Sequence, residues 1–153
     1  MTISTAIPGP LTVGSFVERP NRFLVTVRLK DTGEVVAAHL ADPGRLKELL
    51  LPGAKIWLRP ASNEERKTRW SAVLTEPPEG KGLVSLDSTL PNRLVKEGLE
   101  RGGLAEFSGW EFVRSEVPVG RSRFDFLLSG GPGREQMVVE VKRGEVTMAN
   151  GFP

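Results

Sequence analysis

A chain of 153 residues that is 39% apolar and 26% charged has the composition of one ordinary globular domain or two small ones, which excludes a disordered tail. Without cysteine it can form neither a disulfide framework nor a thiolate metal site, and its single histidine leaves zinc without the usual ligands. The net charge of +2 is compatible with nucleic-acid binding, and the positive excess lies in residues 1–82, which hold 12 basic and 9 acidic residues.

The subcellular location is predicted from the first residues of the chain and from the length of its apolar runs. The first ten residues have no basic region and no sustained apolar stretch, so they do not resemble a secretory signal. No apolar run is long enough to span a bilayer. We therefore expect a cytoplasmic protein with no membrane partner.

Five strands are expected in the first half of the chain, with one helix between the third and the fourth. The strand candidates are runs rich in β-branched and apolar residues bounded by turn residues, at residues 11–17, 23–29, 35–40, 54–58 and 70–76. Residues 43–51 are predicted to form a short helix that begins after a cap at Asp42 and ends at Pro52 and Gly53. This order matches a small Greek-key barrel of the OB type, which we place over residues 1–82.

Basic residues follow the fourth predicted strand and flank the first turn. OB-type barrels bind oligonucleotides on one face and its bordering loops, and aromatic side chains there can stack on bases. The candidate nucleic-acid-binding residues are Arg19, Arg22, Arg59, Arg66, Lys67, Arg69 and Trp70. The alternative, given equal weight, is a solvated loop whose charge Glu64 and Glu65 partly cancel, with Trp70 buried in the barrel.

A proline- and glycine-rich stretch at residues 76–82 marks a domain boundary, so residues 83–153 form a second domain. A helix is predicted over residues 91–101, with Leu94, Val95, Gly98 and Leu99 on its buried face. Glu97 lies beside that face, where it is a candidate third carboxylate for a metal site. An ion pair with Arg93, one turn earlier, is an equally good interpretation of Glu97.

Two alternating runs after this helix place chemically useful side chains on neighbouring strands. Residues 121–128 and 137–142 are predicted to be antiparallel strands joined by a glycine-rich turn. Asp125 on the first strand, and Glu140 and Lys142 on one face of the second, can then converge on one point. Two carboxylates beside an ammonium suit a magnesium-type cation and metal-assisted phosphodiester cleavage. The simpler alternative is a solvent-facing cross-strand ion pair.

The predicted second domain has apolar residues on both faces of its sheet, and one helix covers only one face. We expect Phe124, Phe126 and Leu128 on one face, opposite a second apolar set that comprises Phe112, Val139 and Val141. The second face therefore requires cover from a C-terminal segment beyond residue 153 or from a second copy of the chain in a homodimer.

Several stretches together resemble the sugar fermentation stimulation protein A family, and the resemblance covers nearly the whole chain. They are residues 38–40 with 43–46, the Leu-Pro-Asn-Arg-Leu-Val run at 90–95, the arginine-rich run at 120–128, and Val-Glu-Val-Lys at 139–142. The family implies an OB-type domain followed by a domain resembling the PD-(D/E)xK nucleases, and DNA binding of little sequence preference. Members continue well past the point that matches residues 151–153.

Site residues carry over from the family position by position. Asp125, Glu140 and Lys142 fall on the nuclease motif, so the resemblance implies catalytic roles for them. Glu97 is placed like the helix glutamate of some such enzymes, and Arg121 and Arg123 are implied phosphate contacts. Ser88 stands where many members have asparagine.

The predicted fold is therefore α+β: a five-stranded OB-type barrel followed by a partial nuclease-like αβββ domain. The first functional hypothesis is a DNA-binding protein with a phosphodiesterase site, in which Asp125, Glu140 and Glu97 bind Mg2+ or Mn2+. The second is a non-catalytic DNA-binding regulator of sugar (maltose) utilisation genes. Divalent metal binding separates the two.

Overall fold

The structure is a computed structural model that describes residues 5–42, 44–62, 65–130, 133, 135–142 and 145–150, the last range by its backbone. The chain divides into two compact units, Ile7–Ser88 and a unit formed by Thr89–Pro153 together with Met1–Ala6. The domain boundary near residue 82 stays a prediction. No helix in the described part of the chain is long and apolar enough to cross a membrane.

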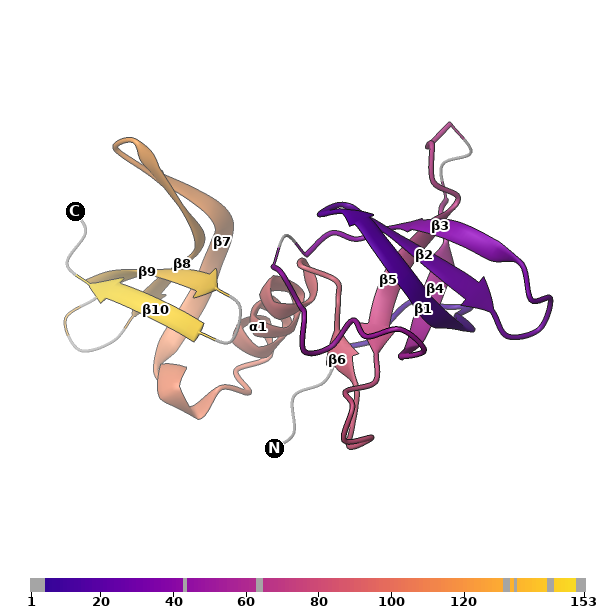
Figure 1. Ribbon diagram of the computed structural model, residues 1–153. Helices are drawn as coiled ribbons and strands as arrows, with labels where there is room; N and C mark the ends of the chain where they lie inside the picture. The colour runs from indigo at the N-terminus through magenta and orange to yellow at the C-terminus, as the bar shows by residue number, and fades with distance from the viewer. Residues whose placement is uncertain are drawn as a thin grey trace. The chain divides into compact units, whose positions relative to one another are not determined.

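Five strands form the closed barrel of the first unit, as predicted (Figure 1). They are β1 (Thr12–Asn21), β2 (Leu24–Leu29), β3 (Val35–His39), β4 (Lys55–Pro60) and β5 (Trp70–Thr75). Antiparallel pairing gives the order β3-β2-β1-β4-β5, and parallel pairing of β3 with β5 closes the barrel. This is the OB-type arrangement, with loops β1–β2 and β4–β5 at its margin.

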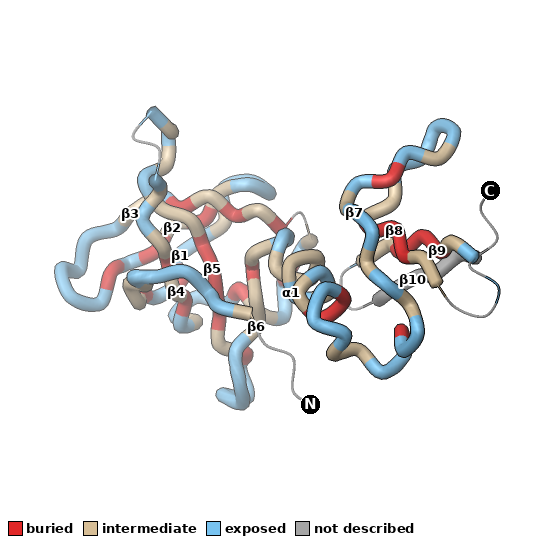
Figure 2. The backbone as a smooth tube through the Cα atoms, turned by 180° about the vertical axis from the view of Figure 1, so that it is seen from behind, coloured by how far each residue is buried: buried red, intermediate tan, exposed pale blue. Residues whose placement is uncertain are grey.

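The barrel core is built from the inward residues of each strand, because successive side chains point to opposite faces (Figure 2). Val25, Val27, Ile56 and Leu58 are all 0% exposed. Gly14 of β1 permits close strand contact, since a Cβ there would lie 2.5 Å from Val27 Cγ1 and 2.6 Å from the Arg28 carbonyl oxygen.

The helix predicted over residues 43–51 is wrong. Pro43 lies outside the described residues, and residues 44–51 form bends and turns. The Asp42 carboxylate accepts a hydrogen bond from the Gly44 N–H (2.8 Å), and Leu46 has a φ of 52°. The guanidinium of Arg19 takes the carbonyls of Gly44 and Arg45, which a helix would need for its own bonds.

Residues 83–86, expected in the second domain, belong structurally to the barrel. The short strand β6 (Val84–Ser85) pairs antiparallel with β5. Leu86 is 0% exposed and packs in the barrel core. Burial of Leu86 thus brings the segment directly after the proline-rich stretch into the barrel core.

In its described residues, the second unit contains one α-helix and a four-stranded antiparallel sheet. The helix is α1 (Leu90–Glu100), followed by the 3-10 turn η1 (Ala105–Phe107), β7 (Trp110–Val119), β8 (Ser122–Gly130), β9 (Glu135–Lys142) and β10 (Glu145–Asn150). The sheet order is β10-β9-β8-β7. The α+β class is confirmed, α1 is shifted by one residue from its prediction, and β10 is a strand that the sequence patterns did not predict.

Two apolar clusters lie in this unit, and their membership corrects the predicted faces. Leu99 of α1 packs with Phe126, Leu128 and Val139, and Phe112 and Val141 join the same cluster. Phe124 instead packs with a second cluster formed by Val117, Leu127 and Val138. The prediction that Phe124 shares a face with Phe126, and that Phe112, Val139 and Val141 lie opposite, is therefore wrong.

The regular alternation of β8 breaks at Asp125, which is also where β9 stops pairing with it. The β8–β9 register ends at Phe126↔Val139, whereas β7 and β8 continue together through Val117↔Phe124 to Val119↔Ser122. The last part of the β7–β8 hairpin is therefore a two-stranded arm that extends beyond β9 (Figure 1). On α1, Leu94 is 36% exposed, so it lies outside the buried face predicted for it.

Candidate functional site

Asp125 lies where β8 and β9 part, and its carboxylate is held by two donors. The Nδ2 group of Asn92, in the first turn of α1, donates to Oδ1 at 2.9 Å. The backbone N–H of Val141 donates to Oδ2 at 2.6 Å. The side chain thus takes the place of a ladder hydrogen bond, and both oxygens keep lone pairs for further partners. An acidic group fixed in this way is suited to bind a cation or a polar ligand.

Glu140 and Lys142 flank Val141 on β9, so they lie directly beside the backbone group that binds Asp125. Their side chains share a face, and Lys142 Nζ lies 3.9 Å from Glu140 Oε2. The side chains are 64% and 37% exposed for Lys142 and Glu140 respectively, so the pair contributes at most about 1 kcal/mol to stability. Both groups can therefore exchange this contact for one with a ligand at little cost.

Glu97 is not brought to this point. Its Oε1 accepts a hydrogen bond from Thr5 Oγ1 at 2.8 Å, and Arg93, the other residue proposed for it, donates to the Ala6 carbonyl at 3.3 Å. Among the residues that the structure describes, no three histidine, cysteine or acidic side chains form a metal-binding group. Glu97, the helix residue of the predicted metal set, thus has another contact in the structure, and Asn92 is the helix residue that reaches Asp125. The predicted metal set of Asp125, Glu140 and Glu97 stays a prediction.

Arg121 and Arg123 lie in the two-stranded arm of β7 and β8. Arg121 is in the turn between the strands, and Arg123 is two residues before Asp125 on β8. Both side chains are exposed. The arm therefore presents two cations to solvent, Arg121 in the turn and Arg123 on the strand that carries Asp125.

Arg59 and Arg66 both line a groove of about 430 Å³ on the barrel, between the 8–10 segment, the end of β4 and the start of β5. Arg59 Nη1 donates to the Pro8 carbonyl at 3.3 Å, and Arg66 Nη1 donates to Ser71 Oγ at 3.1 Å. Both side chains are half-buried. Two guanidinium groups in one groove form a site suited to phosphate.

Arg19 has a different environment from the other predicted cations. Its guanidinium donates to four backbone carbonyls, at 2.6 Å to Gly44, 2.7 Å to Arg45, 2.8 Å to Arg22 and 3.3 Å to Asp42. These bonds tie Asp42, Gly44 and Arg45, together with Arg22 of the β1–β2 loop, to β1. The geometry commits Arg19 to holding two loops in place.

We expect Arg19→Ala to lower the free energy of unfolding by about 2 kcal/mol or more, because bonds from charged donors are lost together. Arg22→Ala is the matched control, since this neighbouring side chain is exposed and should change stability by less than about 0.5 kcal/mol. Urea unfolding followed by tryptophan fluorescence measures both. Equal stability of the two variants would contradict the loop-holding role.

The remaining predicted residues divide between surface and core. Lys67 and Arg69 are exposed in the β4–β5 loop. Trp70 is half-buried and packs against the barrel core, which favours the structural interpretation of this residue. Arg22 is exposed, and its guanidinium carbon lies 5.7 Å from the ring centroid of Phe23.

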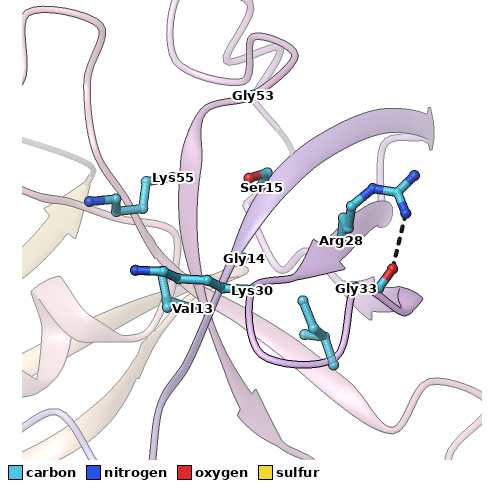
Figure 3. A pocket seen from close by; sticks show the side chains of 9 residues that line it. Val13, Gly14, Ser15, Arg28, Lys30, Gly33, Gly53 and Lys55 are labelled. Atoms are coloured by element: carbon cyan, nitrogen blue, oxygen red, sulfur yellow. Dashed lines mark hydrogen bonds between the residues drawn. The ribbon is translucent and has the colours of Figure 1, made fainter.

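A second cationic hollow, of about 350 Å³, lies over β1, β2 and the start of β4 (Figure 3). Gly14 and Ser15 are at its centre, and Lys30 and Lys55 extend to the same side in that view. Arg28 points to the opposite side and donates a hydrogen bond to the Gly33 carbonyl at 3.0 Å. Lys55 forms an ion pair with Glu76, with 3.9 Å between Nζ and Oε2. The sequence patterns singled out none of these residues.

Family comparisons agree with this two-part structure. One family model, described as the SfsA N-terminal OB domain, matches residues 17–86, and another, described as the sugar fermentation stimulation protein RE domain, matches residues 89–153. The chain belongs to the sugar fermentation stimulation protein A (SfsA) family. The resemblance identified in the sequence is thereby confirmed.

Individual SfsA relatives are similar over most of this chain. A sugar fermentation stimulation protein homolog of Shouchella clausii is 54% identical over 142 residues, covering 93% of this chain and 59% of the relative. One from Moorella thermoacetica is 46% identical over 146 residues, covering 95% and 60%. The structure of Pyrococcus furiosus SfsA in complex with Ca2+ is 27% identical with a TM-score of 0.74, covering 93% of this chain and 58% of that protein. The chain thus spans about three fifths of the length of these relatives.

Two residues of this SfsA chain enter the candidate sites without having been predicted. Asn92 stands in the Leu-Pro-Asn-Arg run that carried the family resemblance, and its amide is a hydrogen-bond donor at the start of a helix. Phe23 begins a strongly apolar run, so it was assigned to a strand, but its side chain is 52% exposed. Phe23 belongs to the turn between β1 and β2, and not to the strand that follows it.

Proposed function

We propose that this SfsA-family protein binds DNA with little sequence preference through its barrel, and that its second unit hydrolyses phosphodiester bonds with a divalent metal ion. The observation that carries the proposal is the Asp125 carboxylate, held by Asn92 and the Val141 N–H beside Glu140 and Lys142. The groove with Arg59 and Arg66 supports the DNA-binding part. Phosphate contacts of this kind bind without reading sequence.

Contacts to DNA would come from two regions of the chain, each on its own unit. On the barrel, the exposed Arg22, Lys67 and Arg69 add to the groove arginines. On the second unit, Arg121 and Arg123 on the β7–β8 arm would bind phosphates close to the acidic site. Loss of any one of these exposed cations should weaken binding to all sequences similarly.

The residues of the second unit fit a hard divalent cation. The similar Pyrococcus furiosus protein was solved in complex with Ca2+. In this chain Asp125 and Glu140 offer carboxylate oxygens, and magnesium-type ions are commonly bound by one or two carboxylates with several waters retained. Two carboxylates from strands that part at Asp125 suit an open site of this type. Mg2+ and Mn2+ are the proposed ions, with Asp125 and Glu140 as ligands.

Each residue then has a separate task. A bound divalent ion stabilises negative charge on the phosphoryl oxygens and lowers the pKa of water. Asp125 is kept in one orientation by its two donors, so it does not need to reorganise on binding. Lys142 has three N–H donors on a flexible stem and would position the attacking water or a phosphate oxygen. Glu97 has no task in this proposal, because its carboxylate accepts a hydrogen bond from Thr5.

A second function, the non-catalytic DNA-binding regulator of sugar utilisation genes, is favoured by one observation. Lys142 is paired with Glu140 at 3.9 Å, and an ammonium group can neutralise a carboxylate in the place of a metal ion. In that case the nuclease-like site would be vestigial. DNA retention would persist, and no phosphodiester bond would be cut.

The proposal is tested by incubating this chain with supercoiled plasmid in the presence of Mg2+, Mn2+ or chelator and measuring cleavage. Retention of the DNA by the protein is followed in parallel by gel shift. Nicking that requires the metal ion, with retention under all three conditions, is the expected result. Retention without nicking under any condition would favour the regulator. Neither retention nor nicking would overturn both functions.

A further inference from the structure

Phe23 is a large apolar side chain that the barrel leaves in solvent. It lies in the loop between β1 and β2, and 52% of it is exposed. Single exposed apolar residues are common on protein surfaces, so exposure alone carries no functional meaning. The contacts around Phe23 distinguish it from such residues.

The loop holds Phe23 from several directions. Its N–H donates to Asn21 Oδ1 at 2.9 Å, and its carbonyl accepts a hydrogen bond from the Leu40 N–H at 2.9 Å. The carbonyl of Arg22 is bound by Arg19 at 2.8 Å. The backbone on both sides of the ring is therefore anchored to the barrel, and an anchored aromatic ring loses little conformational freedom when a ligand covers it.

A cation accompanies the ring. The guanidinium carbon of Arg22 lies 5.7 Å from the centroid of Phe23, a distance typical of a cation–π contact. An aromatic ring beside a guanidinium group can bind both the base and the phosphate of a nucleotide. The base stacks on the ring, and the phosphate pairs with the cation. Trp70, the aromatic residue predicted for stacking, packs against the barrel core instead.

The loop that carries Phe23 lies two strands away from the groove that contains Arg66. Leu24, next to Phe23, pairs with His39 on β3, and His39 pairs with Ser71 on β5. Ser71 in turn accepts the hydrogen bond from Arg66 at 3.1 Å. Two strand spacings separate β2 from β5 across this row, on the order of 10 Å, which a short stretch of extended nucleic acid can bridge.

We propose that Phe23 is a base-stacking platform, and that the barrel therefore prefers single-stranded nucleic acid to duplex. This inference rests on the proposed DNA binding and names its substrate class. In a duplex the base faces are covered by neighbouring bases, so Phe23 has nothing to stack on. A single strand exposes its base faces while it also supplies phosphates to Arg22 and Arg66.

Three labelled probes of equal length test the inference by fluorescence anisotropy: a mixed-sequence single strand, an abasic single strand and a duplex. The single strand should bind on the order of 10-fold more tightly than the abasic strand, since only the former can stack. Phe23→Ala should remove that difference, whereas Phe23→Trp should keep it and show quenching of the new indole on binding. Leu83→Ala is the control, because Leu83 is 54% exposed and lies outside the loop.

The possible outcomes distinguish failure of base stacking from failure of the proposed DNA binding. Equal binding of all three probes by the unmodified protein would leave DNA binding intact and overturn base stacking. Absence of binding to every probe would overturn the proposed DNA binding itself. Thermal unfolding of Phe23→Ala checks that the fold is kept, and unquenched fluorescence in Phe23→Trp would contradict stacking independently of the alanine variant.

Discussion

Asp125→Ala is expected to abolish divalent metal binding by the second unit and to reduce metal-dependent nicking by at least about 100-fold. A bound ion contributes several kcal/mol to stabilising phosphoryl transfer, and each 1.4 kcal/mol is a factor of ten in rate. Glu140→Gln should have a similar effect on both quantities, because it removes the other proposed ligand. Calorimetric titration with Ca2+ measures binding without catalysis, and plasmid nicking with Mg2+ or Mn2+ measures the rate.

The two variants differ in what else they disturb. Asp125→Ala leaves the Val141 N–H and the Asn92 amide without their common acceptor, so some stability is lost with the site. Glu140→Gln removes only an exposed ion pair, so its fold should be unaffected. Glu111→Gln, an exposed carboxylate on β7, is the control for charge alone. Undiminished Ca2+ binding by Glu140→Gln would exclude Glu140 as a ligand.

The barrel strands could be predicted because their signals are local. Turn residues separate the β-branched and apolar runs, and the runs become β1 to β5 with bounds that differ by a few residues. The predicted helix at residues 43–51 failed because its competitor is distant in sequence. Arg19 takes the carbonyls of that segment, and no pattern within the segment reveals an arginine 25 residues earlier.

The candidate acidic site was predictable in part. The two-residue period placed Glu140 and Lys142 on one face, and the structure has them as an ion pair. The same period failed for Phe124, which lies beyond the point where β8 and β9 part and where the Asp125 side chain accepts the bond from Val141. A side chain that accepts a hydrogen bond in place of a backbone carbonyl of the sheet cannot be recognised from an alternating sequence pattern.

The helix residue that contacts Asp125 in the structure differs from the predicted one for a geometric reason. Helix periodicity places Glu97 beside the buried face. It does not reveal which turn of the helix lies opposite Asp125. Asn92, five residues earlier and so roughly 7 Å away along the axis, is the residue that meets Asp125. Asn92 lies outside the predicted buried face of the helix, so helix periodicity does not single it out.

Asn92→Ala is expected to weaken Ca2+ binding about 10- to 100-fold, because residues that orient a metal ligand commonly have effects of that size. Without the bond from Nδ2 the Asp125 carboxylate keeps only the Val141 donor and can rotate about it. Calorimetric titration measures the affinity. Lys96→Ala, which removes an exposed pair with Glu100 elsewhere on α1, should bind Ca2+ as the unmodified protein does.

Asn92→Asp separates orientation from simple loss of packing. It sets a second carboxylate at the position 2.9 Å from Asp125 Oδ1 where an amide now donates, so the two charges repel and the variant should unfold at a lower temperature in chelator. A divalent ion relieves that repulsion, so Ca2+ should raise its melting temperature by more than that of the unmodified protein. Ligand at 100 times its Kd stabilises by about 2.7 kcal/mol, which such a measurement resolves easily. If Ca2+ raised both melting temperatures equally, Asn92 would face no cation, and its bond to Asp125 would serve only to join the helix to the sheet.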